Sequence, residues 1–298
     1  MNGWIVYNTT LKIKKIEDLV DSLCKEAKKL DINLVKVNNL EIIPFYDNNG
    51  IPSLIKNTEL IHPEFIIFWD KDILLARHLE NMGFRVFNSS EAIEACDHKG
   101  LMHIKLSNAN IKVPKTFISP LIFNDYDLGD RYIEQIFESL GKDVVVKESK
   151  GSFGMQVYRC TTYYEFKNKI YEISKKRSDY IVQENISTSY GRDIRVNIIG
   201  GKIIGAMYRE NLNDFRANIS SGGSGRLIEL TEKQKKIALM AHKALNLDFS
   251  GVDILFDKYD EPILCEINSN LNYLSFEKIW GKSFGKELLK YIVGECNA

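Results

Sequence analysis

The sequence predicts an α/β protein that is divided into more than one compact unit. Three observations indicate this class: short apolar strands alternate with amphipathic helices at the start of the chain, strands and helices mix in two later stretches, and the chain has 298 residues. A chain of this length usually splits into two or three cores. Its 44% hydrophobic and 11% aromatic residues are typical of a folded globular protein.

The first unit, residues 1–88, is predicted to be a small parallel α/β domain. Short apolar runs predict strands over residues 4–7, 34–37, 65–68 and 85–87. Apolar residues at Ile16, Leu19, Val20 and Leu23 recur with the spacing of a helix, and a second helix is expected over residues 72–82. Because the strands alternate with helices, we expect a parallel sheet.

Two further units follow in the chain. Ser89 and Ser90 are suitable helix caps and mark the start of the second unit, residues 89–183. Its predicted helices cover residues 99–109 and 131–140 and a stretch that ends near 175, and its strands cover 143–147, 155–160 and 180–184. The third unit, residues 184–298, is predicted to have strands over 193–199, 202–209, 251–256 and 263–268, a polar loop over 210–225 and helices over 231–245 and 284–293.

The charge balance argues against polyanionic partners. The chain has 40 Lys and Arg against 40 Asp and Glu, so no net positive field attracts nucleic acid or an anionic membrane surface. The apolar run over residues 4–7 is too short for a signal peptide or a membrane span, and the five cysteines include no CxxC pair. We expect a cytoplasmic protein with reduced thiols and without nucleic-acid or membrane partners, and a homo-oligomer is left open.

The strongest chemical signal is a predicted antiparallel hairpin made by residues 251–256 and 263–268. If its turn is symmetric, Asp253 lies opposite Glu266, and the period of two places Asn268 on the same face as Glu266. Two facing carboxylates repel each other unless positive charge lies between them. Carboxylate and amide oxygens are suitable ligands for Mg²⁺ that also binds phosphate. The alternative is a solvated polar face on an edge hairpin.

Two weaker signals lie earlier in the chain. A predicted strand delivers Lys147 and is followed by a loop with Gly151 and Gly154, whose backbone amides are suited to phosphates, although a plain turn is the alternative. Residues 181–186 connect the second unit to the third, and such junctions commonly hold cofactors. Asp193 and Arg195 follow this junction, and a surface ion pair is the alternative interpretation of these two residues.

These pieces, in this order, resemble the ATP-grasp superfamily and, within it, the RimK-type amino-acid (glutamate) ligases. The resemblance covers residues 85–295, with a weaker match to the domain that precedes the grasp fold. The residues that carry it are Asp97-His98-Lys99, Val146-Lys147 with residues 151–154, Val182-Gln183-Glu184, residues 191–195, Asp214-Phe215-Arg216-Ala217-Asn218 before Gly222-Gly223, residues 251–254, and Glu266-Ile267-Asn268. It implies a pre-ATP-grasp domain over 1–88, a central lobe over 89–183 and a C-terminal lobe with the magnesium site over 184–298.

The resemblance also implies roles for individual residues. The cofactors would be ATP and two Mg²⁺ ions, with Mn²⁺ as a substitute. Asp253, Glu266 and Asn268 would hold the metal ions, and Arg216 would stabilise the transferring γ-phosphoryl group, with Lys147 as the second catalytic residue. The nucleotide-binding set would be Lys99 and Lys147 on the α and β phosphates, Gly151, Ser152, Phe153 and Gly154 closing over them, Gln183, Glu184, Asn185 and Ile186 at the adenine hinge, and Asp193 near the ribose or phosphates.

The implied activity is that of an ADP-forming carboxylate–amine ligase that makes an amide through an acyl phosphate, with an amino acid as one substrate. The chain departs from the glutamate ligases after Asn268, where it has Ser269-Asn270-Leu271-Asn272-Tyr273 instead of a small residue followed by Ser, Pro and Gly. The acceptor, whether metabolite, peptide or carrier protein, is therefore left open. Arg195, Tyr208 and Arg209 are candidates for a substrate carboxylate or for structural contacts. The alternatives are an ATP-binding regulatory protein and a small-molecule kinase.

Overall fold

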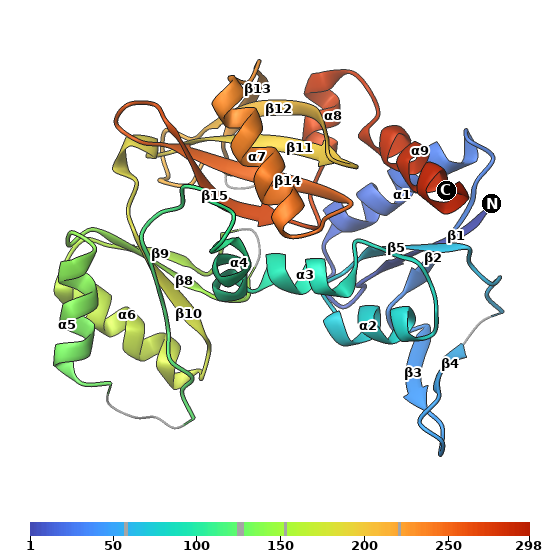
Figure 1. Cartoon of the computed structure of the whole chain (residues 1–298), viewed down its shortest axis with the longest axis horizontal. Coiled ribbons are helices and arrows are strands. Elements are labelled where there is room, and N and C mark those ends of the chain that lie inside the picture. The colour runs from blue at the N-terminus through green and yellow to red at the C-terminus, as the bar shows by residue number, and fades with distance from the viewer. Residues whose placement is uncertain (57–58, 124–127, 152–153, 220–221) are drawn as a thin grey trace.

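The computed structural model describes residues 1–56, 59–123, 128–151, 154–219 and 222–298. In this part of the chain, three sheets and one separate hairpin are combined with helices, which confirms the α/β class (Figure 1). The N-terminal unit, the central unit and the C-terminal unit each contain one of the three sheets. No helix among the described residues combines the length and apolar character that crossing a membrane requires.

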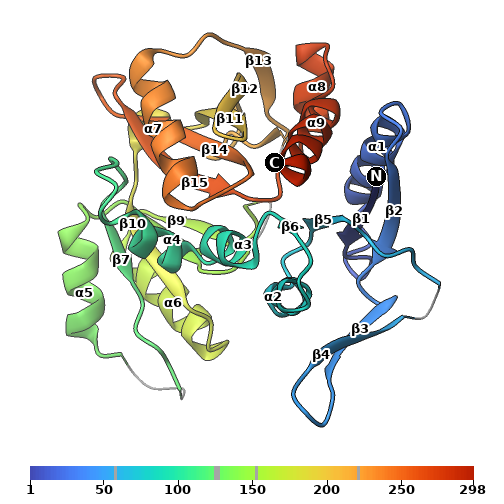
Figure 2. The same cartoon turned by 45° about the vertical axis from the view of Figure 1, so that its right-hand side comes forward.

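The N-terminal unit contains the predicted parallel sheet, in the order β2-β1-β5-β6. Its elements are β1 (Asn2–Tyr7), α1 (Lys14–Lys28), β2 (Asn33–Asn38), β5 (Phe65–Trp69), α2 (Ile73–Asn81) and β6 (Val86–Phe87). A hairpin of β3 (Ile42–Tyr46) and β4 (Pro52–Lys56), which the sequence pattern does not predict, projects from this unit (Figures 1 and 2). Its strands lack an alternating apolar face because most of their side chains are exposed or half-buried.

The central unit is built on an antiparallel sheet in the order β7-β10-β8-β9. Its elements are β7 (Thr116–Ile118), α5 (Asp130–Ser139), β8 (Val144–Glu148), β9 (Val157–Cys160), α6 (Tyr163–Lys175) and β10 (Tyr180–Glu184). Thr162 and Glu165 form a capping box at the start of α6. Both helices pack on one face of the sheet and bury a core of their own (Figure 1).

The C-terminal unit has a five-stranded antiparallel sheet in the order β13-β12-β11-β14-β15. Its elements are β11 (Arg192–Ile199), β12 (Lys202–Glu210), β13 (Ser224–Leu227), α7 (Glu232–Ala244), β14 (Phe249–Phe256), β15 (Pro262–Asn268), α8 (Leu274–Trp280) and α9 (Phe284–Asn297), with a short 3-10 helix over Ser187–Ser189 before them. The polar loop predicted over 210–225 ends in β13, because its last residues pair with β12. The helix α8 was not predicted from the sequence pattern either.

Two of the cores are shared between distant parts of the chain. The helices α3 (Ser90–Asp97) and α4 (Lys99–Leu106) pack into the core of the C-terminal sheet. The terminal helices α8 and α9 lie in one core with α1 and the parallel sheet. The predicted boundary near residue 89 stays a prediction. Residues before this boundary share a core with the terminal helices that follow it.

Gly191 fixes the start of β11 against the loop that carries Arg216. Its φ is +64°, and a Cβ at this position would lie 2.2 Å from the carbonyl oxygen of Asn211. We expect Gly191→Ala to lower the free energy of unfolding by at least about 3 kcal/mol, because strain and a backbone clash add together. Gly201→Ala is the matched control: φ is +70° there, but no described atom lies within 4 Å, so about 1–2 kcal/mol is expected. Urea denaturation measures the free energy of unfolding of both variants. Equal losses of this free energy would contradict the role of the clash with Asn211.

Candidate active site

A cavity of about 610 Å³ lies where the three units meet. Its walls come from the ends of β1 and β5, from α4, β8 and β10, and from the sheet strands β11, β12, β14 and β15. Ser152 and Phe153 lie outside the described residues, and every other residue that the sequence assigns to nucleotide, metal or catalysis lines this cavity. Of the three candidates for a substrate carboxylate, Arg195 and Arg209 line it and Tyr208 does not. The structure therefore brings together side chains that are up to 169 positions apart, from Lys99 to Asn268.

The hairpin of β14 and β15 has the register that the sequence predicts. Asp253 pairs with Glu266, and Asn268 lies on the same side, where its Nδ2 donates to Oε1 of Glu266 at 3.3 Å. The register shifts directly after Asp253, so that Ile254 pairs with Leu264. Cys265 is the extra residue of this bulge, and bulges commonly re-aim side chains next to active sites.

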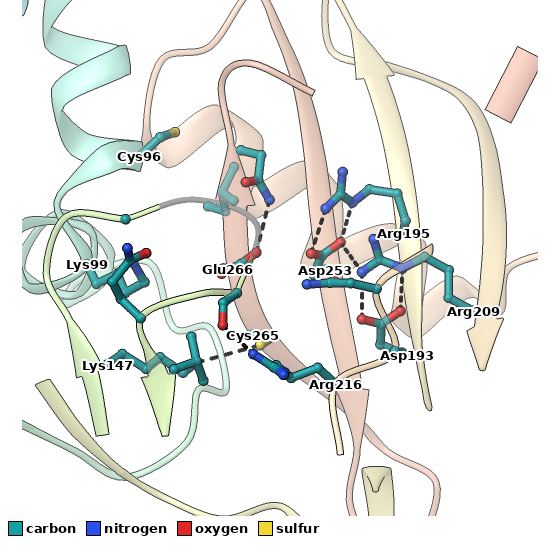
Figure 3. A pocket seen from close by; sticks show the side chains of 18 of the residues that line it. Cys96, Lys99, Lys147, Asp193, Arg195, Arg209, Arg216, Asp253, Cys265 and Glu266 are labelled. Atoms are coloured by element: carbon teal, nitrogen blue, oxygen red, sulfur yellow. Dashed lines mark hydrogen bonds and ion pairs between the residues drawn. The ribbon is translucent and has the colours of Figure 1, made fainter. Parts of the chain in front are cut away.

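Asp253 is neutralised by two arginines. Arg195 donates to both carboxylate oxygens, with Nη2 to Oδ2 at 2.7 Å, and Nη2 of Arg209 lies 3.0 Å from Oδ1 (Figure 3). Arg209 also donates to both oxygens of Asp193, at 2.7 and 2.6 Å. Burial alone would raise the pKa of Asp253, but the two guanidinium groups outweigh it and lower this pKa. Facing carboxylates alone therefore do not require a metal ion, because arginines supply positive charge on the Asp253 side.

Among the described residues, no group of three His, Cys, Asp or Glu side chains is placed to hold a metal. Glu266 and Asn268 line the cavity and have oxygen atoms that could coordinate a metal ion. Asp253 already accepts three hydrogen bonds from arginines. A carboxylate has about four lone-pair sites, so one is left for a cation. The assignment of Asp253, Glu266 and Asn268 as metal ligands stays a prediction.

Two buried lysines line the other side of the cavity (Figure 3). The Nζ of Lys99 donates to the carbonyl oxygen of Glu148 at 3.2 Å, and the Nζ of Lys147 lies 3.9 Å from the sulfur of Cys265. Burial lowers the pKa of Lys99, while the carboxylate of Glu266 raises it and so opposes this effect. Both ammonium groups are therefore kept out of bulk water, where an anionic ligand would stabilise them.

Arg216 closes the cavity near the glycine loop. Its Nη1 donates to the carbonyl oxygen of Gly154, and its Nη2 donates to Asp214 at 2.6 Å. Gly154 has a φ of +72°, and a Cβ there would lie 3.1 Å from Asn218 and 3.3 Å from Arg216. The glycine therefore permits the loop to approach the arginine closely.

The junction between β10 and β11 forms one end of the cavity. Gln183, Glu184, Asn185 and Ile186 all line it. The side chain of Gln183 donates to the hydroxyl of Thr116 at 2.9 Å, and Oε1 of Glu184 accepts from the backbone of Lys115 at 2.8 Å. The side chain of Asn185 donates to Asp143 at 2.8 Å, so these contacts hold the junction in one conformation.

The N-terminal unit contributes residues to the cavity that were not predicted from the sequence. Asn8 and Asp70 directly follow β1 and β5, and they line the cavity together with Lys71. The sequence does contain a signal for this contribution. Asp70 and Lys71 directly follow the apolar run at 65–69, and ligands of α/β sheets bind at the carboxyl ends of the strands. Asn270 and Asn272, from the loop that departs from the family pattern, also line the cavity.

Comparisons with known proteins agree with these motifs. The family model described as the RimK-like ATP-grasp domain matches residues 96–292. The uncharacterized protein MG012 of Mycoplasma genitalium is 32% identical over 289 residues, which are 96% of this chain and 93% of that protein. N-acetylaspartylglutamate synthase A of Homo sapiens is 30% identical over 223 residues, which are 74% of this chain and 56% of the synthase.

The fold is also that of solved ligases. The crystal structure of D-alanine–D-alanine ligase from Bacillus anthracis in complex with ATP matches with a TM-score of 0.72, covering 99% of this chain and 97% of that chain. At 17% sequence identity this likeness concerns the fold alone. Since the family model covers 197 of the 298 residues, counted from 96 to 292, the chain belongs to the RimK-like ATP-grasp family of ATP-dependent ligases.

Proposed function

We propose that this chain is a carboxylate–amine ligase that forms an amide through an acyl phosphate and releases ADP. We further propose that one substrate is an amino acid, with L-glutamate as the first candidate, because a relative is named for a glutamate-containing product. The observation that carries the proposal is that one cavity is lined by buried lysines, by Arg216 and by the possible metal ligands Glu266 and Asn268, which come from separate units.

The charges of the cavity suit phosphoryl transfer followed by acyl transfer. In the first step the substrate carboxylate attacks the γ-phosphorus of ATP, and ADP leaves. In the second step the amine attacks the acyl carbon, the bond to the phosphate oxygen breaks, and the nitrogen gives up a proton. The protein positions the reactants and stabilises charge, so no covalent enzyme intermediate is needed. We assign Lys99 and Lys147 to the phosphates and Arg216 to the transferred group, because all three line the cavity.

The donor set also fits magnesium. Glu266 and Asn268 would hold the ion with neighbouring hard oxygen ligands, and Asp253 would add a third at the one lone-pair site that the arginines leave. When bound, Mg²⁺ supplies neutralisation of the phosphate oxygens. We propose two ions, with Mn²⁺ as a substitute.

Adenine is assigned to the junction between β10 and β11. Its four residues, Gln183 to Ile186, line the cavity where the central and C-terminal units meet. Asp193 is proposed for the ribose or phosphate side, although both of its oxygens are engaged by Arg209.

Product analysis tests the proposal. The purified protein is incubated with Mg²⁺ and ATP, with each of a panel of carboxylates that includes N-acetylaspartate, and with each of the twenty protein amino acids. We expect ADP and phosphate to appear only when both a carboxylate and an amine are present. Production of AMP and pyrophosphate would reject the acyl phosphate. Binding of ATP without turnover would favour a regulatory protein, and a stable phosphorylated product without amine would favour a kinase.

Arg216 gives a more specific prediction. Replacing it with alanine should lower kcat by roughly 10²- to 10³-fold, because a donor that stabilises developing charge is lost. The affinity for ATP, measured by titration calorimetry, should change far less. Arg226→Ala is the control, since Arg226 is exposed and packs over Tyr208 in the same unit. An equal loss of kcat in both variants would contradict the assignment.

A further inference from the structure

We propose that Asp70 and Asn270 form a subsite that binds the ammonium group of the amine substrate before it reacts. Asn8 positions the Asp70 carboxylate, because its Nδ2 donates to Asp70 while its Oδ1 accepts from Thr10. This inference rests on the proposed ligase function and assigns one end of the cavity to one substrate. The subsite belongs to the N-terminal unit and to the loop after β15, in which the chain departs from the family pattern.

The topology of the parallel sheet opens a crevice at this place. The strand β1 pairs with β2 on one side and with β5 on the other. The chain runs from β1 to β2 in one direction across the sheet and from β5 to β6 in the opposite direction, so the two connections diverge between β1 and β5. Tyr7 and Trp69 are paired neighbours at the carboxyl ends of these strands, and Asn8 and Asp70 are the next residues. Ligands of open α/β sheets bind at such a switch point.

Asp70 has a buried carboxylate that makes no ion pair among the described residues, although the charge of Lys71 acts on it from a distance. Its exposed fraction is 6%, and it accepts hydrogen bonds from the amide of Asn8 at 3.2 and 3.1 Å and from the backbone of Lys71 at 2.7 Å. The ammonium of Lys71 instead pairs with Asp97. Burial raises the pKa of Asp70. A buried carboxylate without an ion pair is stabilised by a cation that enters from the cavity.

Asn270 supplies a second, independent acceptor. Its Nδ2 donates to the backbone oxygen of Asp70 at 2.7 Å, whereas its Oδ1 is buried and has no hydrogen-bond partner among the described residues. An unpaired buried acceptor costs free energy, and a primary ammonium has three donors to offer. The carboxylate of Asp70 and the amide oxygen of Asn270 both line the cavity, and two acceptors match an ammonium group better than they match an anion.

The position of the subsite is compatible with acyl transfer. The Nζ of Lys71 lies 3.5 Å from the carbonyl oxygen of Gly151, at the start of the glycine loop. Asn270 follows Asn268 by two residues, and both line the same cavity as Glu266. An amine held by Asp70 is thus in the same enclosed space as the proposed site of the acyl phosphate.

The test separates amine binding from acyl phosphate formation. Wild type and Asp70→Asn are assayed with Mg²⁺, ATP and the carboxylate panel, first with hydroxylamine and then with an equimolar mixture of the twenty amino acids. Hydroxylamine is uncharged at slightly alkaline pH and traps acyl phosphates as hydroxamates. For Asp70→Asn, we expect the half-saturating amino-acid concentration to rise roughly 10- to 100-fold, because a charged hydrogen bond is lost. Hydroxamate formation should stay within about twofold of wild type, since the neutral probe makes no use of this charge.

Two further variants complete the test. Asp248→Asn removes another partly buried carboxylate, bonded to Tyr291 at 2.8 Å and outside the cavity, and should leave both assays unchanged. Asn270→Ala removes the orphan acceptor and should raise the half-saturating concentration roughly 3- to 10-fold, which keeps the inference testable if Asp70→Asn does not fold.

Three results would overturn the inference while the proposed function stands. The first is an unchanged half-saturating amino-acid concentration in Asp70→Asn, the second is an equal loss of hydroxamate formation, and the third is rescue of the variant by additional Mg²⁺. A wild type that does not respond to amino acids would overturn both the inference and the proposal that one substrate is an amino acid. Absence of both hydroxamate and ADP in wild type would instead refute the proposed function itself.

Discussion

Glu266→Gln is expected to lower kcat/KM by about 10²- to 10⁴-fold, because the substitution removes the negative charge of a proposed metal ligand and keeps its shape. Glu266 lines the cavity and accepts a hydrogen bond from Asn268, and its charge raises the pKa of Lys99. The measurement is ADP release as a function of Mg²⁺ concentration. The variant should require more Mg²⁺ for half-maximal activity while its thermal midpoint stays close to that of wild type.

Glu261→Gln is the matched control for this experiment. Glu261 lies on the same hairpin, directly before β15, but its carboxylate contacts Lys233 at 2.5 Å on the surface and does not line the cavity. This variant should keep full activity. Retention of more than about a tenth of the wild-type kcat/KM by Glu266→Gln would contradict the metal assignment.

The largest expected effect on stability comes from Arg209. This side chain is buried between Asp193 and Asp253, and its exposed fraction is 6%. Arg209→Met removes the only described cation that bridges both carboxylates and should lower the free energy of unfolding by about 3–5 kcal/mol. Urea denaturation at neutral pH measures the change.

Arg77→Met provides the comparison for an exposed pair. Arg77 contacts Glu94 at 2.9 Å, and both side chains are more than 40% exposed. Its replacement should cost less than about 1 kcal/mol. Adding Asp193→Asn to Arg209→Met should recover part of the loss, because one uncompensated charge disappears. No recovery would mean that the network is held by packing instead of charge balance.

The C-terminal hairpin shows what the sequence can predict. Asp253 and Glu266 are opposite each other because strand side chains alternate with a period of two, and this period is visible in the sequence. The bulge at Cys265 was not predictable, since one extra residue changes no pattern of apolar and polar positions. The roles given to Arg195 and Arg209 also stayed ambiguous until their distances to Asp253 were known.

Other elements escaped prediction for physical reasons. The hairpin of β3 and β4 carries exposed apolar side chains such as Ile43 and Ile55, so it lacks the inward and outward alternation of a core strand. The short helix α8 follows the unusual loop after Asn268 and buries mainly Phe276. The meeting of Asn8 with Asp70 depends on strand order, which the sequence pattern leaves undetermined.

The core that α1 shares with α8 and α9 has a consequence for synthesis on the ribosome. Leu23 and Phe65 emerge early, whereas Phe284 and Leu288, which pack in the same cluster, are translated last. The apolar surface of α1 and the parallel sheet is therefore covered by α8 and α9 only after nearly the whole polypeptide has been made. Until then we expect this surface to be exposed, and a chain shortened before α9 should aggregate more readily than the full chain.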